Sequence, residues 1–328
     1  MPGTVIRGGI TPKSVVASGT GVVFAQNMIY SHTITVYDAA GKLLKTIPDA
    51  VDLAAFGITG HPAGAVKGGP VEMAFSPDGK DAYVSNYSMY GPGFTHPGHD
   101  ACSPASGYDS SFVYRVNVAK LTIDKVIPVG SVPKYVATTP DGRYVLVTNW
   151  CSYDLSVIDV AAGREVKRLP IGPHPRGIAV DSSSRTAYIA VMGGRDIVTV
   201  DLATFAVGRI ADVGGSPRHL VLSPDDKTLY ATLNADGQVA KIDLASGRVS
   251  AKVNTGSAPR SMAISADGLS LYVVNYESST VSKVDAGTMR VMQSLPTSHH
   301  PIGITYDAST GRIWVACYSG TLELFNEA

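Results

Sequence analysis

The chain has 328 residues with 27 Lys and Arg against 27 Asp and Glu, so its formal net charge is zero. This balance argues against a global electrostatic attraction to nucleic acid or membrane surfaces. Hydrophobic residues make up 45% and charged residues 16% of the sequence, which supports a large folded core and excludes a disordered chain. No apolar run approaches the roughly 20 residues of a membrane-spanning helix, and no signal peptide is visible.

The first predicted elements are two irregular repeat units and a leading strand. Residues 4–9 form an apolar run of strand type. A unit with short β-rich runs opens at Pro12 and ends in an insertion of about residues 49–69. The next unit opens at Pro70 and carries an insertion of about residues 90–109 between its second and third strands.

From Pro133 onward the sequence repeats every 42 residues, and such a fixed period indicates a repeat architecture. Each unit contains four short runs rich in β-branched and aromatic residues, separated by turns that contain Asp, Gly, Pro and Ser. This pattern predicts four antiparallel strands joined by hairpins. Repeated around an axis, they form the blades of a β-propeller. The 3.6-residue period of a helical solenoid is missing.

The number of blades follows from the prolines that open the units. The last unit contains about three strands, and residues 4–12 match residues 125–133 at the end of an earlier unit. We therefore expect the N-terminal strand to complete the C-terminal blade and close the ring, which leaves no open sheet edge. The sequence predicts an all-β fold, a single seven-bladed β-propeller domain over residues 1–328. The seven prolines are Pro12, Pro70, Pro133, Pro175, Pro217, Pro259 and Pro301.

Three motifs carry a resemblance to a known family. Tyr83-Val84-Ser85-Asn86, Val147-Thr148-Asn149 and Tyr272-Val273-Val274-Asn275, with their PDG-type turns, resemble the YVTN-type β-propeller family, which includes YncE-like and surface-layer-like proteins. One repeat departs from the motif, with Ala190-Val191-Met192. The resemblance implies a seven-bladed extracytoplasmic protein. Some relatives bind DNA, and the wider propeller group includes lactonases and a lyase, so the fold alone implies no single function.

One face of the propeller is expected to hold the functional site. Loops between blades and loops between second and third strands share this face, whereas the PDG turns lie on the other. Both insertions and all eight histidines map to the first face or its margin. Functional residues are often placed on loops that a rigid scaffold supports. The histidines are His32, His61, His96, His99, His174, His219, His299 and His300.

A ring of cations is the first candidate site. The residue after each unit-opening proline begins the innermost strand near the channel mouth, and five of these seven residues are Lys or Arg. Converging guanidinium groups bind carboxylate or phosphate, so we expect an anionic ligand. Alternatively, each cation pairs with an acid on the next blade, such as Glu72, Asp154 or Glu277. The predicted ligand-binding residues are Lys13, Glu72, Lys134, Arg176, Arg218, His219, Arg260, Tyr87, Trp150 and Tyr276.

A metal site is the second candidate. The segment His96-Pro97-Gly98-His99-Asp100 offers two imidazoles and a carboxylate within five residues, and zinc and copper favour such ligands. Alternatively, these are solvated histidines in a surface loop rich in Pro and Gly. We expect that the protein requires no cofactor. If it does bind a zinc or copper ion, His96 and His99 are the candidate ligands.

The three cysteines bear on the compartment. Cys102 lies in the second insertion and Cys151 in the equivalent loop of the next blade, so we predict a disulfide between them that tethers the insertion. Cys317 is expected to be a buried free thiol. The alternative is three unpaired thiols in a cytosolic protein. The disulfide favours an oxidising compartment, and hence a secreted or cell-envelope protein whose leader is absent from this sequence.

Three functional hypotheses follow. We favour a non-enzymatic, monomeric extracytoplasmic module that binds an anionic small molecule, a glycan or a protein partner. The second hypothesis is a lyase or lactone hydrolase that uses histidines, with or without a metal, as acid and base. The third is a sensory or structural domain of a larger envelope protein. Nucleic-acid binding is not favoured because the net charge is zero.

Overall fold

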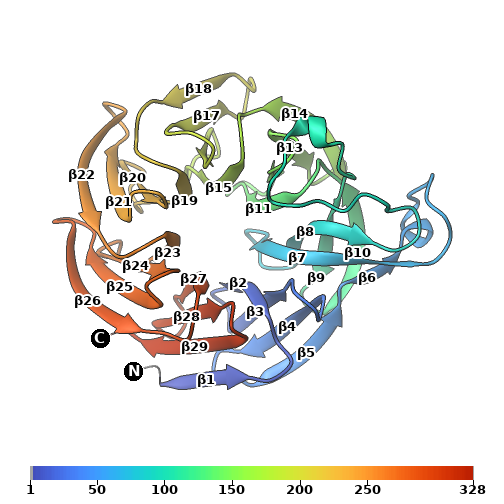
Figure 1. The fold of residues 1–328 in the computed structure, drawn as a ribbon, viewed down its shortest axis with the longest axis horizontal. Helices are drawn as coiled ribbons and strands as arrows, with labels where there is room; N and C mark the ends of the chain where they lie inside the picture. The colour runs from blue at the N-terminus through green and yellow to red at the C-terminus, as the bar shows by residue number, and fades with distance from the viewer. Residues whose placement is uncertain (1–2, 328) are drawn as a thin grey trace.

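The computed structural model describes residues 3–327, so residues 1, 2 and 328 of the predicted domain lie outside the description. Seven antiparallel sheets surround a central axis like the blades of a propeller (Figure 1). Six sheets have four strands and one has five. The predicted all-β, seven-bladed fold is therefore confirmed, with one additional strand in the second blade.

The blades follow one another in chain order, and six of the seven unit-opening prolines begin an innermost strand. Blade one contains β2 (Pro12–Ala17), β3 (Val22–Asn27), β4 (Thr33–Asp38) and β5 (Leu43–Pro48). Blade two contains β6 (Ala50–Asp52), β7 (Ala65–Phe75), β8 (Asp81–Tyr90), β9 (Phe112–Asn117) and β10 (Thr122–Pro128). Blade three contains β11 (Pro133–Thr138), β12 (Tyr144–Asn149), β13 (Asp154–Asp159) and β14 (Arg164–Pro170).

The later blades keep the same plan. Blade four contains β15 (Pro175–Val180), β16 (Thr186–Val191), β17 (Ile197–Asp201) and β18 (Val207–Ile210). Blade five contains β19 (Pro217–Leu222), β20 (Thr228–Leu233), β21 (Gln238–Asp243) and β22 (Arg248–Asn254). Blade six contains β23 (Pro259–Ile264), β24 (Ser270–Asn275), β25 (Thr280–Asp285) and β26 (Arg290–Pro296). Blade seven contains β27 (Pro301–Asp307), β28 (Arg312–Cys317), β29 (Thr321–Asn326) and β1 (Thr4–Arg7).

The N-terminal strand closes the ring as predicted. β1 pairs antiparallel with β29, with Ile6 opposite Leu322, and the two strands lie side by side in Figure 1. The Ile6 side chain packs against a buried cluster that contains Trp314 and Leu324. Pairing β29 with β1 therefore covers an edge that would otherwise expose unpaired backbone groups.

The hydrophobic core consists of layers between neighbouring blades. One cluster joins Leu146 and Leu155 of blade three to Ile178 and Ile189 of blade four. Because successive residues of a strand point to opposite faces, each sheet contributes to the layer on either side. Burial of each such side chain contributes about 1.5–3 kcal/mol. The layers fix the spacing of the blades and hence the geometry of the central channel.

The two insertions enlarge blade two in different ways. The first forms β6 and a short 3-10 helix, η1 (Leu53–Phe56), and it lengthens β7. β6 pairs with the beginning of β7, so this insertion extends the sheet rather than forming a separate loop. The second insertion is irregular except for the 3-10 helix η2 (Pro104–Ser106), and it contacts the loops of blade three.

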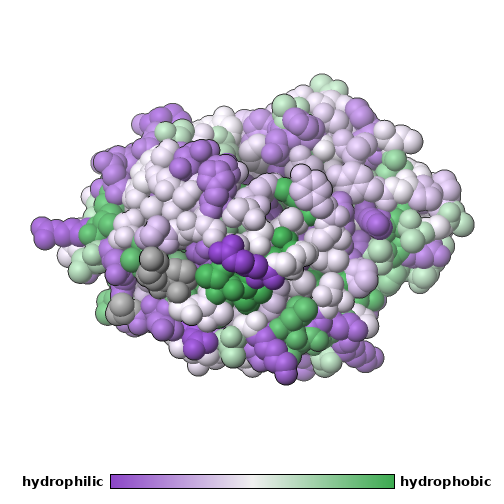
Figure 2. All heavy atoms as spheres, turned by 60° about the horizontal axis from the view of Figure 1, so that its bottom comes forward, coloured by the Kyte–Doolittle hydropathy of each residue, from purple (hydrophilic) through white to green (hydrophobic). Residues whose placement is uncertain are grey.

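The exterior carries small apolar areas among hydrophilic residues on the side shown in Figure 2. Exposed apolar side chains include Leu43 and Leu44 of β5 and Met292 of β26. Scattered exposed residues of this kind are normal for a folded protein. Across the described residues, no helix is long and apolar enough to cross a membrane.

Candidate functional site

A β-bulge after the opening proline of each repeat unit places the predicted cations. The register shifts immediately after the first proline of the strand, for example between Pro133 and Tyr135 in β11. The same irregularity follows Pro12, Pro70, Pro175, Pro217, Pro259 and Pro301. A bulge leaves its extra residue outside the ladder and redirects the side chain. The repeated bulge thus explains why the residue after the proline lies outside the sheet ladder and presents its side chain to the channel.

The five cations converge at one end of the channel, which we call the mouth. We use the term cationic ring for Lys13, Lys134, Arg176, Arg218 and Arg260. The pKa of Lys13 is well below its usual value, because the ammonium is buried and because the other four cations are close enough to repel its charge. Burial, followed by Arg176 and Arg260, lowers the pKa of Arg218 in the same way. Five blades therefore contribute one cation each to a common site.

Three of the five ring cations are buried with no carboxylate of the described residues at ion-pair distance. The exposed fractions are 8% for Lys13, 6% for Arg176 and 2% for Arg218. Within residues 3–327, the side chains of these three residues have no carboxylate within ion-pair distance and donate no hydrogen bond. An unpaired charge removed from water is costly. An anion bound beside these cations would lower that cost.

Acids neutralise the ring only in part. Lys134 Nζ lies 2.5 Å from Asp100 Oδ1. Glu72 lies in the channel, where burial raises its pKa to about 7 against the opposing effect of Arg176 and other ring cations. The other two acids considered as partners lie elsewhere: Asp154 accepts a hydrogen bond from Asn149, and Glu277 lies 3.8 Å from His300. The structure therefore does not pair each cation with an acid of the next blade.

Aromatic rings surround the ring cations. Lys134 Nζ lies 4.2 Å from the ring centroid of Tyr87 and 5.3 Å from that of Trp150. The guanidinium of Arg260 lies 3.8 Å from the ring centroid of Tyr276. The predicted aromatic residues are thus brought to the cations, where cation–π contacts compensate part of the lost hydration. Tyr318, which was not among the predicted ligand-binding residues, lies 5.1 Å from Lys13 Nζ.

Two cavities connect with these residues. A cavity of about 290 Å³ at the mouth is lined by residues that include Lys13, Lys134, Asp100, Tyr87 and His32. This volume is close to the lower limit for small-molecule sites, about 300 Å³. A chamber of about 180 Å³ contains Glu72, Tyr135 and His219 in its lining.

His219 has a structural environment that the sequence did not indicate. It lies in the chamber rather than among the loops of the mouth face, so its predicted place on that face is corrected. Its Nε2 lies 3.0 Å from the Tyr135 hydroxyl, and its Nδ1 accepts a hydrogen bond from the backbone N–H of Met262. Burial and the charge of Arg218 lower the pKa of His219 to about 3, so the imidazole is neutral.

The second insertion does not assemble a metal centre around its two histidines. His96 Nδ1 lies 3.0 Å from the carbonyl oxygen of Gly107, and His99 Nδ1 accepts a hydrogen bond from the backbone N–H of Ala101. In the described part of the chain, no group of three or more His, Cys, Asp or Glu residues could hold a metal ion. The zinc or copper prediction gains no geometric support.

The cysteine prediction is confirmed. Cys102 and Cys151 form a disulfide with a Cα–Cα distance of 5.4 Å. Cys317 is buried and free, and burial raises the pKa of its thiol to about 12. The disulfide fastens the second insertion to blade three, beside the mouth.

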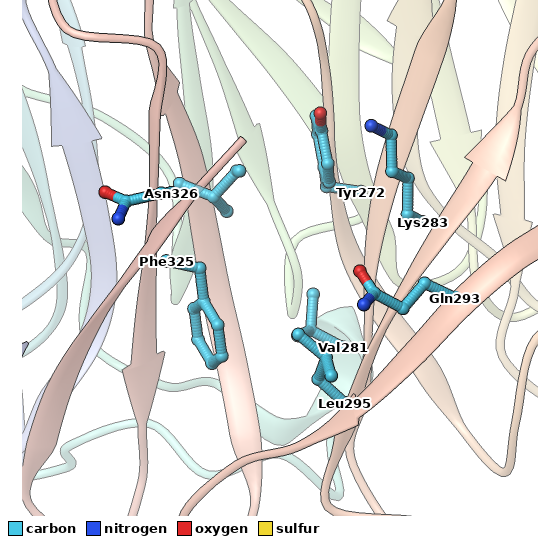
Figure 3. A pocket seen from close by; sticks show the side chains of 8 residues that line it. Tyr272, Val281, Lys283, Gln293, Leu295, Phe325 and Asn326 are labelled. Atoms are coloured by element: carbon cyan, nitrogen blue, oxygen red, sulfur yellow. The ribbon is translucent and has the colours of Figure 1, made fainter. Parts of the chain in front are cut away.

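A smaller hollow lies away from the channel. Figure 3 shows side chains of blades six and seven facing each other across it. Its volume is about 30 Å³, comparable to the share of one water molecule in the liquid. It is too small for an organic ligand, and the mouth remains the candidate site. The lining residues are Tyr272, Val281, Lys283, Gln293, Leu295, Ile313, Phe325 and Asn326.

Comparisons with known proteins support the fold, and one of them matches part of the chain to a heme domain. Residues 211–316, about a third of the chain, match the family model of the cytochrome D1 heme domain. The structure is similar to Kuenenia stuttgartiensis hydrazine synthase, with a TM-score of 0.76 and 19% identity over 100% of this chain and 99% of that chain. At this identity the likeness shows the propeller fold alone. A search of curated proteins finds no match.

The comparisons correct one prediction. We expected that the protein requires no cofactor, but residues 211–316 match a heme domain, and this finding contradicts the expectation. The matched segment contains Arg218 and Arg260 of the cationic ring, together with Tyr276 and His300 beside it. The residues at the mouth come from separate repeats and form no contiguous motif, so nothing in the sequence pattern indicated a match to a heme domain.

Proposed function

We propose that this protein is an extracytoplasmic propeller module that binds a ligand with several carboxylates, of the heme class, at the mouth of the channel. The observation that carries the proposal is the convergence of Lys13, Arg176 and Arg218, which are buried without a carboxylate partner in the described structure. Two resident acids, Asp100 and Glu72, oppose five cations. A multiply charged anion would supply the missing negative charge.

The chemistry of the mouth fits a heme-like ligand. Such a molecule combines an apolar planar ring system with carboxylates at its edge. The cationic ring offers groups that bind carboxylates, and Tyr87, Trp150 and Tyr276 offer flat aromatic surfaces beside them. The match of residues 211–316 to a heme domain favours this class over other carboxylate-bearing ligands.

Two histidines at the mouth are the residues that could bind the iron of a heme. His32 lines the mouth cavity, and its Nδ1 lies 2.7 Å from the carbonyl oxygen of Gly68. A hydrogen bond of this kind leaves Nε2 as the coordinating atom and is usual for metal-bound histidines. His300 stacks on Tyr276 with centroids 4.1 Å apart. A bound heme would supply redox or gas-binding chemistry, and the cationic ring and one of these histidines would hold it.

The location and the partners are part of the same proposal. The Cys102–Cys151 disulfide supports an oxidising compartment, and the YVTN-type motifs support a cell-envelope or secreted protein. We propose a monomer. A protein partner or an anionic envelope glycan would meet the same cationic ring, and such ligands are the alternative to heme.

Binding of hemin and of iron-free protoporphyrin IX tests the proposal. Quenching of tryptophan fluorescence follows the binding of either probe, because the chain has two tryptophans, Trp150 beside the mouth and Trp314 buried in blade seven. We expect R176A/R218A to weaken binding of both probes about 100-fold, because two charge-assisted contacts are lost. The control R195A/R209A removes two exposed cations that are paired at the rim, and it should bind normally.

The two probes separate heme recognition from general anion binding. We expect H32A or H300A to shift the absorption of bound hemin while protoporphyrin IX still binds, because the metal-free ring needs no axial ligand. If R176A/R218A binds both probes as tightly as the wild-type protein, the mouth is not the site. If neither probe binds but an anionic glycan does, the heme class is wrong and the anion site stands.

A further inference from the structure

We propose that Asp100 determines which anions the mouth accepts, because its carboxylate occupies the position at Lys134 that a carboxylate of the ligand would otherwise take. The inference rests on the proposed function, since it concerns the same site. It assigns a selective role to an acid from the irregular second insertion. The ring would accept a small monoanion at blades four to six and resist a polyanion, because the further charges of a polyanion come close to Asp100 at blade three.

The contacts of Asp100 resemble those of a bound anion. Its Oδ1 accepts hydrogen bonds from Lys134 Nζ at 2.5 Å and from the Tyr87 hydroxyl at 3.2 Å. Lys134 is 4% exposed, whereas the side chain of Asp100 is 66% exposed and lines the mouth cavity. The acid therefore reaches the buried cation from the ligand's side of the site. Burial acts in the opposite direction, but Lys134 holds the pKa of Asp100 well below its usual range.

The loop that carries Asp100 is fixed before and after this residue. Gly98 donates its backbone N–H to Ser88 Oγ at 2.9 Å, and a Cβ at this glycine would lie 2.0 Å from Val132 Cγ2. The indole of Trp150 donates to the backbone carbonyl of Asp100 at 2.9 Å. The backbone on both sides of Asp100 is thus fixed, and its carboxylate does not belong to a freely moving surface side chain.

The far anchor of the loop is Cys102. It forms the disulfide with Cys151, and its carbonyl accepts hydrogen bonds from the Tyr153 hydroxyl and from His174 Nε2, both at 3.0 Å. These contacts join the loop to blade three and to the loop before blade four. Because both anchors belong to the scaffold, Asp100 keeps its place when the site is empty.

A fixed acid beside a cationic site acts on a ligand in two ways. It neutralises Lys134, so this cation attracts a second anion less strongly than Arg176 or Arg218 does. It also repels any anionic group of the ligand that approaches blade three, and a contact that disfavours some ligands is a common source of specificity. The penalty grows with the number of anionic groups, so a small monoanion escapes it and an extended polyanion does not.

Replacing the charge while keeping the shape tests the inference. Citrate, with three carboxylates, and acetate, with one, are the probes, and their affinities are measured by calorimetry for the wild-type protein and for D100N. The side-chain oxygen of Asn can still accept hydrogen bonds from Tyr87 and Lys134. We expect D100N to bind citrate about tenfold or more tightly, the effect of one unit charge a few ångströms away at a partly buried site, and acetate with little change. The control D124N removes an acid that pairs with Arg115 at 2.7 Å in the same blade, and it should match the wild type.

A second variant moves the acid without changing its charge. G98V places a side chain against Val132 and displaces the loop, so it should also bind citrate more tightly; circular dichroism and the melting temperature check its fold. If the wild type binds citrate and D100N binds it equally or less tightly, the inference is overturned and the proposed function stands. If D100N alone binds citrate, the selective role is supported. If neither protein binds citrate, the inference is overturned, and the hemin titration alone decides the proposed function.

Discussion

The hydroxyl of Tyr135 in blade three lies 3.0 Å from Nε2 of His219 in blade five. Since His219 Nδ1 accepts the backbone N–H of Met262 at 3.3 Å, this nitrogen carries no proton. The neutral imidazole therefore has its proton on Nε2 and donates it to the Tyr135 oxygen. This assignment follows from the hydrogen-bond network. The proton of the Tyr135 hydroxyl is left to donate to a group in the chamber.

The first prediction is that His219, paired with Tyr135, stays neutral in acid. Because burial and Arg218 lower its pKa to about 3, His219 should keep the Nε2–H tautomer at pH 5, and ¹⁵N NMR should show it. In Y135F the imidazole N–H loses its acceptor, which should lower the free energy of unfolding by about 1–3 kcal/mol without changing the tautomer. A charged imidazole at pH 5 would contradict the assignment.

A second prediction concerns Glu72 and the pH dependence of stability. Its pKa is about 7 in the folded protein against a usual value of 4.5. Between these values the folded state binds more protons than the unfolded state, so this group stabilises the protein fully below pH 4.5, and the contribution is lost as the pH rises through 7. In E72Q this loss should disappear. Urea denaturation at pH 4.5, 6 and 8 measures the difference between variant and wild type. A constant difference across this range would show that Glu72 does not titrate there.

The repeat explains how much of this site the sequence could predict. The residue after the opening proline meets the same bulge in each blade, so Arg176 and Arg218 could be placed in the channel from spacing alone. The contact between Asp100 and Lys134 could not, because Asp100 belongs to an insertion that has no counterpart in the other repeats. The pairing of Tyr135 with His219 was missed because it crosses the channel between blades that are not neighbours.

The fifth strand of blade two is another feature that could not be predicted from the sequence. Residues 49–69 were expected to form an insertion on the mouth face, and the sequence did not reveal that a part of it, β6, pairs along the lengthened β7, with Val51 opposite Val66. A strand of three residues is too short to show an alternating pattern. The expectation that no cofactor is required failed for a related reason, since the residues that would hold one come from several repeats and form no motif.

A third prediction concerns the disulfide. Under denaturing, non-reducing conditions the protein should show one reactive thiol, Cys317, and after reduction it should show three. The double variant C102S/C151S should lose about 2–4 kcal/mol of unfolding free energy, because the bond closes a long loop of the unfolded chain. Urea denaturation with and without reductant provides the control: reductant should lower the stability of the wild type to that of the variant. Three reactive thiols before reduction would rule the disulfide out.

The last prediction concerns the contact between blades four and five at the level of the ring. A Cβ on Gly177 would lie 2.7 Å from the carbonyl oxygen of Arg218 and 2.8 Å from Cα of His219. Both are backbone atoms, so β19 would have to move in G177A and would carry Arg218 with it. We expect a loss of about 1–3 kcal/mol in unfolding free energy, together with weaker hemin binding. The matched control is G194A, where the nearest atom to a new Cβ is 3.8 Å away and both quantities should be unchanged. If G177A and G194A behave alike in urea denaturation and in hemin titration, the close approach of the two blades does not position Arg218.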